Sequence, residues 1–201
     1  MSALPAAARA APLPWRLLSV SLAILAMLGW GIEPGLLDWQ PTLLLTQPWR
    51  LFSAVGVHYS AAHLLLNLAG LAGVAALGAV ARIDSALAWA WVVAWPLTQL
   101  GLLVDPELVH YGGLSGVLHA GVAIVAIHLL RRAASRGRRI GVAILLGLAL
   151  KVGLEFPWSP PAFHATLQIM VTPLAHVSGL VAGLVCGGAV HLLGRRRRRD
   201  A

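Results

Sequence analysis

Long apolar stretches separated by short polar segments run through the whole sequence. A helix of about 20 apolar residues crosses the ~30 Å hydrocarbon core of a bilayer, where every backbone N–H and C=O needs a partner within the segment. The pattern predicts an all-α, polytopic membrane protein with six spans in a single domain over residues 1–201. The predicted spans are approximately Trp15–Ile32, Ala61–Ala81, Ser85–Val104, Leu114–Leu130, Ile140–Leu154 and Leu174–Leu193.

The composition agrees with this prediction. Apolar residues make up 59 % of the chain and charged residues 11 %, against roughly 25 % charged residues in a typical soluble domain. A soluble enzyme and a disordered regulator are therefore excluded. The single cysteine, Cys186, excludes a disulfide framework and a multi-cysteine metal site.

Basic residues are distributed unequally between the two sides of the predicted bundle. If the amino terminus is cytoplasmic, all of the 15 Lys and Arg residues except Arg50 and Lys151 fall on the cytoplasmic side. The positive-inside rule then places both termini in the cytoplasm. Basic clusters at 131–139 and 195–199 are typical of contacts with anionic lipid headgroups, so the bilayer is the expected partner and nucleic acid is not.

Polar residues inside predicted spans are costly and point to function. His63 and Asn67 lie four residues apart and therefore share one face in the outer half of the second span. Ser115 and His119 have the same spacing at the outer start of the fourth span, and His176 lies in the first turn of the sixth. Three spans thus bring these five side chains to a similar depth.

This set of residues has the chemistry of a serine nucleophile. A histidine can take the proton of a serine hydroxyl, and Asn, His or backbone N–H groups can hold the oxyanion that follows. The sequence predicts Ser115 as nucleophile, His176 as base, and Asn67 and His63 as oxyanion donors. No acidic residue lies inside a predicted span, so we expect a Ser–His dyad that requires no metal or cofactor.

Four motifs resemble those of the rhomboid family of intramembrane serine proteases. The segment Gly113-x-Ser115-Gly116 resembles the nucleophile motif of that family. The segment His176-x-x-Gly179-x-x-x-Gly183 resembles its sixth-helix motif, and we interpret the two glycines as packing residues. The residues His58, His63 and Asn67 resemble the motif of the second rhomboid helix. The pair Trp49-Arg50 resembles the motif of the first rhomboid loop. The resemblance implies a six-helix rhomboid-like bundle whose active site opens to the extracytoplasmic side. It also implies cleavage of a transmembrane substrate near its extracytoplasmic end.

The run Gly-Leu-Ser-Gly-Val-Leu-His over residues 113–119 resembles the rhombosortase subfamily. That resemblance implies a bacterial cytoplasmic-membrane enzyme acting on proteins with a carboxyl-terminal Gly-Gly, an apolar helix and a basic tail. Many rhomboids have an aromatic residue at the position of His119, where it packs on the catalytic histidine. Here His119 either tunes His176 or binds a carbonyl.

Several alternatives remain open at this stage. The chain is also consistent with a general rhomboid protease, a non-catalytic rhomboid-like binder, or a membrane haem or metal protein that uses some of its eight histidines. The sequence does not separate hydrolysis from transfer to an amine, and it leaves the oligomeric state open. His58 either orders the site or is an interfacial histidine. The proline-rich loop 155–173 is either a cap over the site or a stiff connector, and it cannot be helical throughout.

Overall fold

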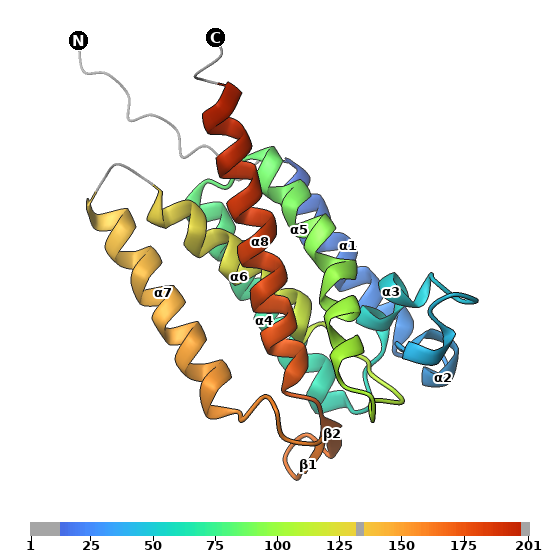
Figure 1. The fold of residues 1–201 in the computed structure, drawn as a ribbon. Helices are drawn as coiled ribbons and strands as arrows, with labels where there is room; N and C mark the ends of the chain where they lie inside the picture. Colours follow the sequence, from blue (N-terminus) through green and yellow to red (C-terminus); the bar gives the residue numbers. More distant parts are fainter. Residues whose placement is uncertain (1–12, 132–134, 198–201) are drawn as a thin grey trace, which may run out of the picture.

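The computed structural model describes residues 13–131 and 135–197, which form a bundle of six long helices (Figure 1). The basic residues Arg9, Arg132, Arg198 and Arg199 lie outside the described residues. The long helices are α1 (Leu13–Gly29), α4 (Ala61–Ala81), α5 (Ser85–Leu100), α6 (Ser115–Leu130), α7 (Ser135–Leu154) and α8 (Leu174–Arg197).

Shorter elements lie between the long helices. The segment between α1 and α4 contains α2 (Pro34–Leu37), η1 (Pro41–Leu43), α3 (Arg50–Ser53) and η2 (Ala54–Gly56), and η3 (Gly101–Val104) extends α5. The loop between α7 and α8 holds an antiparallel hairpin of β1 (Ala162–His164) and β2 (Ile169–Val171). The prediction that this loop is not helical throughout is confirmed, whereas the hairpin itself was not predicted.

Each predicted span coincides with one long helix. Within the described residues, three helices are long and apolar enough to cross a membrane, at Ala61–Ala81, Ser85–Val104 and Leu174–Gly194. Helices α1 and α6 are apolar but have only 17 and 16 residues. The structure therefore supports a helical membrane protein, and the count of six crossings remains a prediction. Helix α1 begins and α8 ends at the same end of the bundle (Figure 1), as an even number of crossings requires.

Local sequence signals explain the boundaries of α4 and α5. The hydroxyl of Ser60 accepts a hydrogen bond from the backbone N–H of His63 at 3.1 Å and so caps the start of α4. Arg82 ends α4 in the left-handed conformation with φ of 54°. The carboxylate of Asp84 then caps α5 by accepting from the N–H of Leu87 at 2.9 Å. The two helices are therefore joined by a tight turn.

Helix α6 is the centre of the bundle, and most of its residues are buried. On one side its backbone meets that of α8 through glycines. A Cβ added at Gly179 would overlap the carbonyl oxygen of Gly116, and one at Gly183 would overlap that of Ala120. On another side, the indole of Trp91 in α5 donates to the carbonyl of Val117 at 2.8 Å. Small residues thus let α6 and α8 pack at backbone distance, as predicted for Gly179 and Gly183.

This close approach predicts opposite outcomes for two alanine substitutions on α8. Gly179→Ala forces α8 away from Gly116 and should destabilise the fold by about 1–3 kcal/mol, the usual cost of overpacking. Gly188→Ala places its methyl group in open space and should leave stability unchanged. Thermal unfolding in detergent measures both, and equal midpoints for the two variants would contradict the packing described.

Candidate active site

Ser115 and His176 meet at one end of the bundle, although 61 residues separate them in the sequence. Ser115 is the first residue of α6, and His176 lies in the first turn of α8. The Nε2 atom of His176 is 3.0 Å from the Oγ atom of Ser115. This is hydrogen-bond distance, and it is the geometry that a nucleophile and its base need.

The segment that leads into Ser115 is held by backbone hydrogen bonds. Trp39 and Tyr111 exchange two N–H···O bonds, of 2.7 and 2.9 Å, in an isolated antiparallel bridge. The N–H of Gly113 donates to the carbonyl of Ala54 at 2.9 Å. Gly113 has a φ of 130°, which side chains disfavour, and an added Cβ would lie 2.9 Å from the ring of His63. Glycine is required here so that the turn can enter α6 beside that ring.

Ser115, His176, His63 and Asn67 line one cavity of about 560 Å³. The side chains of His63 and Asn67 are 8 % and 5 % exposed. Within the described part of the chain, Nδ1 of His63 and Nδ2 of Asn67 have no hydrogen-bond partner. A buried polar group without a partner costs about 1–3 kcal/mol, so a ligand oxygen within reach of either atom would offset that cost. The four residues predicted to act together are therefore brought to one cavity.

His119 holds the ring of His176. The two imidazoles stack with centroids 4.2 Å apart and an interplanar angle of 16°. The Nδ1 atom of His119 lies 2.6 Å from the backbone oxygen of Ser115. Since a carbonyl only accepts, Nδ1 carries the proton. His119 therefore binds a carbonyl, which is one of the two roles left open for it, and it also packs on His176; that it tunes His176 stays a prediction.

Glu155 reaches the other side of His176, and this corrects the expectation that no acidic residue does so. The Oε2 atom of Glu155 is 2.6 Å from Nδ1 of His176, and the Nζ atom of Lys151 donates to Oε1 at 2.6 Å. Burial alone would raise the pKa of Glu155, but the bonds to His176 and Lys151 outweigh it and lower this pKa to about 2. The sequence did not point to Glu155, because this residue follows the fifth predicted span and the expected dyad rested on the absence of acidic residues inside the spans. The available signal was the i,i+4 pairing of Lys151 with Glu155 at the outer end of that span.

His58 is placed behind the site rather than in it. Its ring centroid lies 4.9 Å from that of His63, and its Nδ1 atom is 3.3 Å from the carbonyl of Gly56. Burial lowers the pKa of His58, so the ring is neutral and can donate this bond. His58 therefore supports the ring of His63 and does not line the cavity with Ser115.

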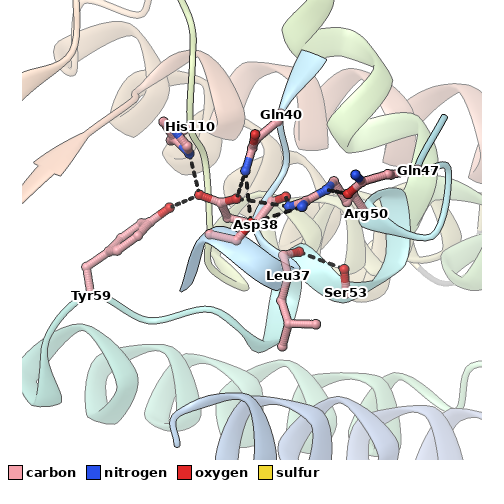
Figure 2. A network of polar contacts seen from close by, with 9 residues as sticks. Leu37, Asp38, Gln40, Gln47, Arg50, Ser53, Tyr59 and His110 are labelled. Carbon is pink, nitrogen blue, oxygen red and sulfur yellow. Dashed lines mark hydrogen bonds and ion pairs between the residues drawn. The ribbon is translucent and has the colours of Figure 1, made fainter. Parts of the chain in front are cut away.

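Trp49 and Arg50, the other predicted supporting residues, lie away from Ser115. Trp49 is 51 % exposed, whereas Arg50 is buried. Arg50 forms an ion pair of 3.2 Å with the buried carboxylate of Asp38 and donates to the Asp38 carbonyl at 2.7 Å (Figure 2). Arg50 and Asp38 therefore connect the two ends of the segment that precedes α4.

Asp38 extends this network to His110 and Tyr59 (Figure 2). Its Oδ2 atom accepts from Nδ1 of His110 at 2.7 Å and from the hydroxyl of Tyr59 at 3.3 Å. Burial and the charge of Asp38 raise the pKa of Tyr59, which keeps its proton. Tyr59 and His110 both line the cavity. The sequence had indicated no role for these three residues.

The hairpin between α7 and α8 covers the same cavity. Leu167, Ile169 and Met170 contribute to its lining. The hydroxyl of Ser60, at the start of α4, donates to the carbonyl of Leu167 at 2.5 Å. The loop 155–173 thus lies over the site and is tied to α4, while the idea that it moves as a cap remains a prediction.

Histidines elsewhere do not form a ligand cluster. Over residues 13–131 and 135–197, no group of three or more His, Cys, Asp or Glu side chains is placed to hold a metal ion. His128 and His191 stack at 6.0 Å near the opposite end of α6 and α8. The metal-site alternative therefore has no set of three such ligands in this part of the chain.

A helical membrane bundle with a serine and a histidine at hydrogen-bond distance defines a class of candidate serine hydrolases. The Rhomboid domain family model matches residues 45–192. The chain therefore belongs to the rhomboid family, whose members are generally intramembrane serine proteases. None of the curated proteins compared with the chain matches it significantly.

The Asp38–Arg50 pair gives a prediction on stability. Arg50→Met leaves the buried carboxylate without its cation and should destabilise the fold by about 3–5 kcal/mol. Arg16→Met, which removes an exposed cation, should have little effect. Thermal unfolding in detergent measures both. Adding Asp38→Asn to Arg50→Met should restore part of the loss, and no recovery would argue against an uncompensated charge as the cause.

Proposed function

We propose that the protein is an intramembrane serine endopeptidase in which Ser115 is the nucleophile and His176 the base. The observation that carries this proposal is the 3.0 Å separation of Ser115 Oγ and His176 Nε2 in a chain that belongs to the rhomboid family. The cavity at Ser115 supports it, because it offers room for a peptide segment and two unpaired polar side chains.

The reaction follows from this geometry. His176 takes the proton of Ser115 as Oγ attacks the scissile carbonyl carbon. Asn67, His63 and backbone N–H groups of the first turn of α6 hold the oxyanion. The C–N bond then breaks, and His176 gives its proton to the leaving amine. Water, or an amine in a transfer reaction, attacks the acyl-enzyme and releases Ser115.

The walls of the cavity favour a substrate that enters from the membrane. Beyond Ser115 the lining is apolar and includes Leu66, Val74, Leu118 and Leu148. These residues suit a transmembrane segment, and the site at the predicted extracytoplasmic ends of α6 and α8 suits a cut near the outer end of that segment. We place the enzyme in the bacterial cytoplasmic membrane, as a multi-pass protein whose site opens to the extracytoplasmic side.

We further propose that the enzyme is a rhombosortase. Its substrates would carry a carboxyl-terminal Gly-Gly, an apolar helix and a basic tail. The run of residues 113–119 supports this subfamily, because it ends in His119, and His119 stacks on His176. A general rhomboid protease acting on other membrane proteins is the alternative within the same family.

Labelling with a fluorescent serine-hydrolase probe tests the chemistry. Purified wild type in detergent should be labelled, whereas Ser115→Ala and His176→Ala should not, because each removes half of the Ser–His pair. Ser135→Ala, at the start of α7, is the matched control and should be labelled as wild type is.

Other results would point elsewhere. A folded wild type without label would favour a non-catalytic binder, and a stoichiometric Soret band in the same sample would favour a haem protein. Label that survives Ser115→Ala would show that another residue is the nucleophile.

The oxyanion role of Asn67 predicts a loss of turnover. Asn67→Ala should lower kcat by about 10²–10³ with little change in KM, because the lost hydrogen bond forms mainly in the transition state. Cleavage of a fluorogenic transmembrane peptide in liposomes measures both constants. Gly73→Ala, which adds a methyl group in open space on α4, is the control. An equal rise in KM with unchanged kcat would assign Asn67 to substrate binding instead.

A pair of substrates tests the subfamily. A membrane peptide with Gly-Gly, an apolar span and an Arg tail should be cleaved at least about tenfold faster, in kcat/KM, than the same peptide with Val-Val, a preference in the range that small pocket contacts supply. Equal rates would favour a general rhomboid protease. Mass spectrometry of the product with and without an added amine separates hydrolysis from transfer.

A further inference from the structure

His176 has a hydrogen-bond partner on each ring nitrogen. Nε2 lies 3.0 Å from Ser115 Oγ, and Nδ1 lies 2.6 Å from Glu155 Oε2. An ionised carboxylate only accepts hydrogen bonds, so Nδ1 carries the proton and Nε2 presents a lone pair to Ser115. Glu155 thus selects the one neutral tautomer in which His176 can act as a base.

Glu155 is itself held in place. Its second oxygen accepts from Lys151 at 2.6 Å across one turn at the end of α7. Its side chain is 30 % exposed, while that of His176 is 12 % exposed. The contact between Glu155 and His176 is therefore more sheltered from water on the His176 side, where a charge would form during the reaction.

We propose that Glu155 is a positioning residue that completes a Ser115–His176–Glu155 triad. The inference rests on the proposed protease function and replaces the expected dyad. When His176 takes the proton from Ser115, the carboxylate of Glu155 stabilises the imidazolium and fixes the plane of the ring. Glu155 stays ionised and takes no proton in the cycle, as in other triads. Its pKa of about 2 agrees with that role.

Four variants test the triad by their rates of cleavage and probe labelling. Glu155→Gln should lower kcat by about 10²–10⁴ with KM within about twofold, because an amide can donate to Nδ1 and favour the wrong tautomer. Glu155→Asp keeps the charge and should recover part of that loss. Lys151→Met leaves Glu155 in place and should cost less than about tenfold, the range of an exposed ion pair. Glu107→Gln, the same change in an outer loop, should match wild type.

A spectroscopic readout separates positioning from a merely structural role. In protein labelled with ¹⁵N-histidine, the Nδ1 resonance of His176 should report a protonated nitrogen in wild type. In Glu155→Gln this resonance should move toward the unprotonated position. Thermal midpoints of all variants in detergent show whether each one folds.

Different failures lead to different conclusions. The triad would be overturned if Glu155→Gln were as active as wild type while Ser115→Ala and His176→Ala showed no cleavage and no labelling. That result would still support the protease function. A loss in Lys151→Met equal to that in Glu155→Gln, with equal falls in thermal midpoint, would make the contact structural and would also overturn the triad. A folded wild type that is never labelled and never cleaves would overturn the protease function, and the triad with it.

Discussion

The hydrogen bond between Ser115 and His176 depends on backbone contact between α6 and α8. Gly116 and Gly179 face each other with no room for a methyl group, and Gly183 continues the contact one turn further along α8. Helices with larger residues at such a crossing pack 8–10 Å apart. At backbone distance, the first turns of both helices bring a short serine and a histidine into reach. The glycines therefore set the geometry of the site, and no catalytic role is proposed for Gly179 or Gly183.

The site is polar in an otherwise apolar bundle, and its polar groups divide into two kinds. One kind is paired: Asp38 accepts hydrogen bonds from Arg50, Tyr59 and His110 in a network next to the cavity. The buried Nδ1 atom of His63 and Nδ2 atom of Asn67 have no partner among the described residues. Burying an unpaired polar group is costly. The network ties Tyr59 and His110, which line the cavity, to Asp38. The unpaired atoms of His63 and Asn67 are the ones to which the proposed function gives an oxyanion role.

The long helices were accessible from the sequence because they follow from local rules. The pairing of Ser115 with His176 was accessible because the order of the spans and the rhomboid-like motifs predict both residues at a similar depth. Apolar runs define helices in a membrane, and the spacing of His63 and Asn67 puts both on one face. The hairpin at Ala162–His164 and Ile169–Val171 was not accessible, because only its contacts with the bundle order so short a pair of strands. The bonds of Asp38 to His110 and Tyr59 join residues 72 and 21 positions apart. No periodicity signals such pairs.

The position of Glu155 just after α7 has a physical reason. An ionised carboxylate at the centre of a bilayer costs several kcal/mol, so a carboxylate that must stay charged is better placed at the interface. Glu155 follows the last residue of α7 and keeps part of its surface exposed. Lys151, one turn back, offsets its charge. The 2.6 Å hydrogen bond then joins this carboxylate to His176, whose side chain is only 12 % exposed. The apolar spans therefore point to Ser115 and His176, whereas the residue proposed to orient His176 lies just outside them.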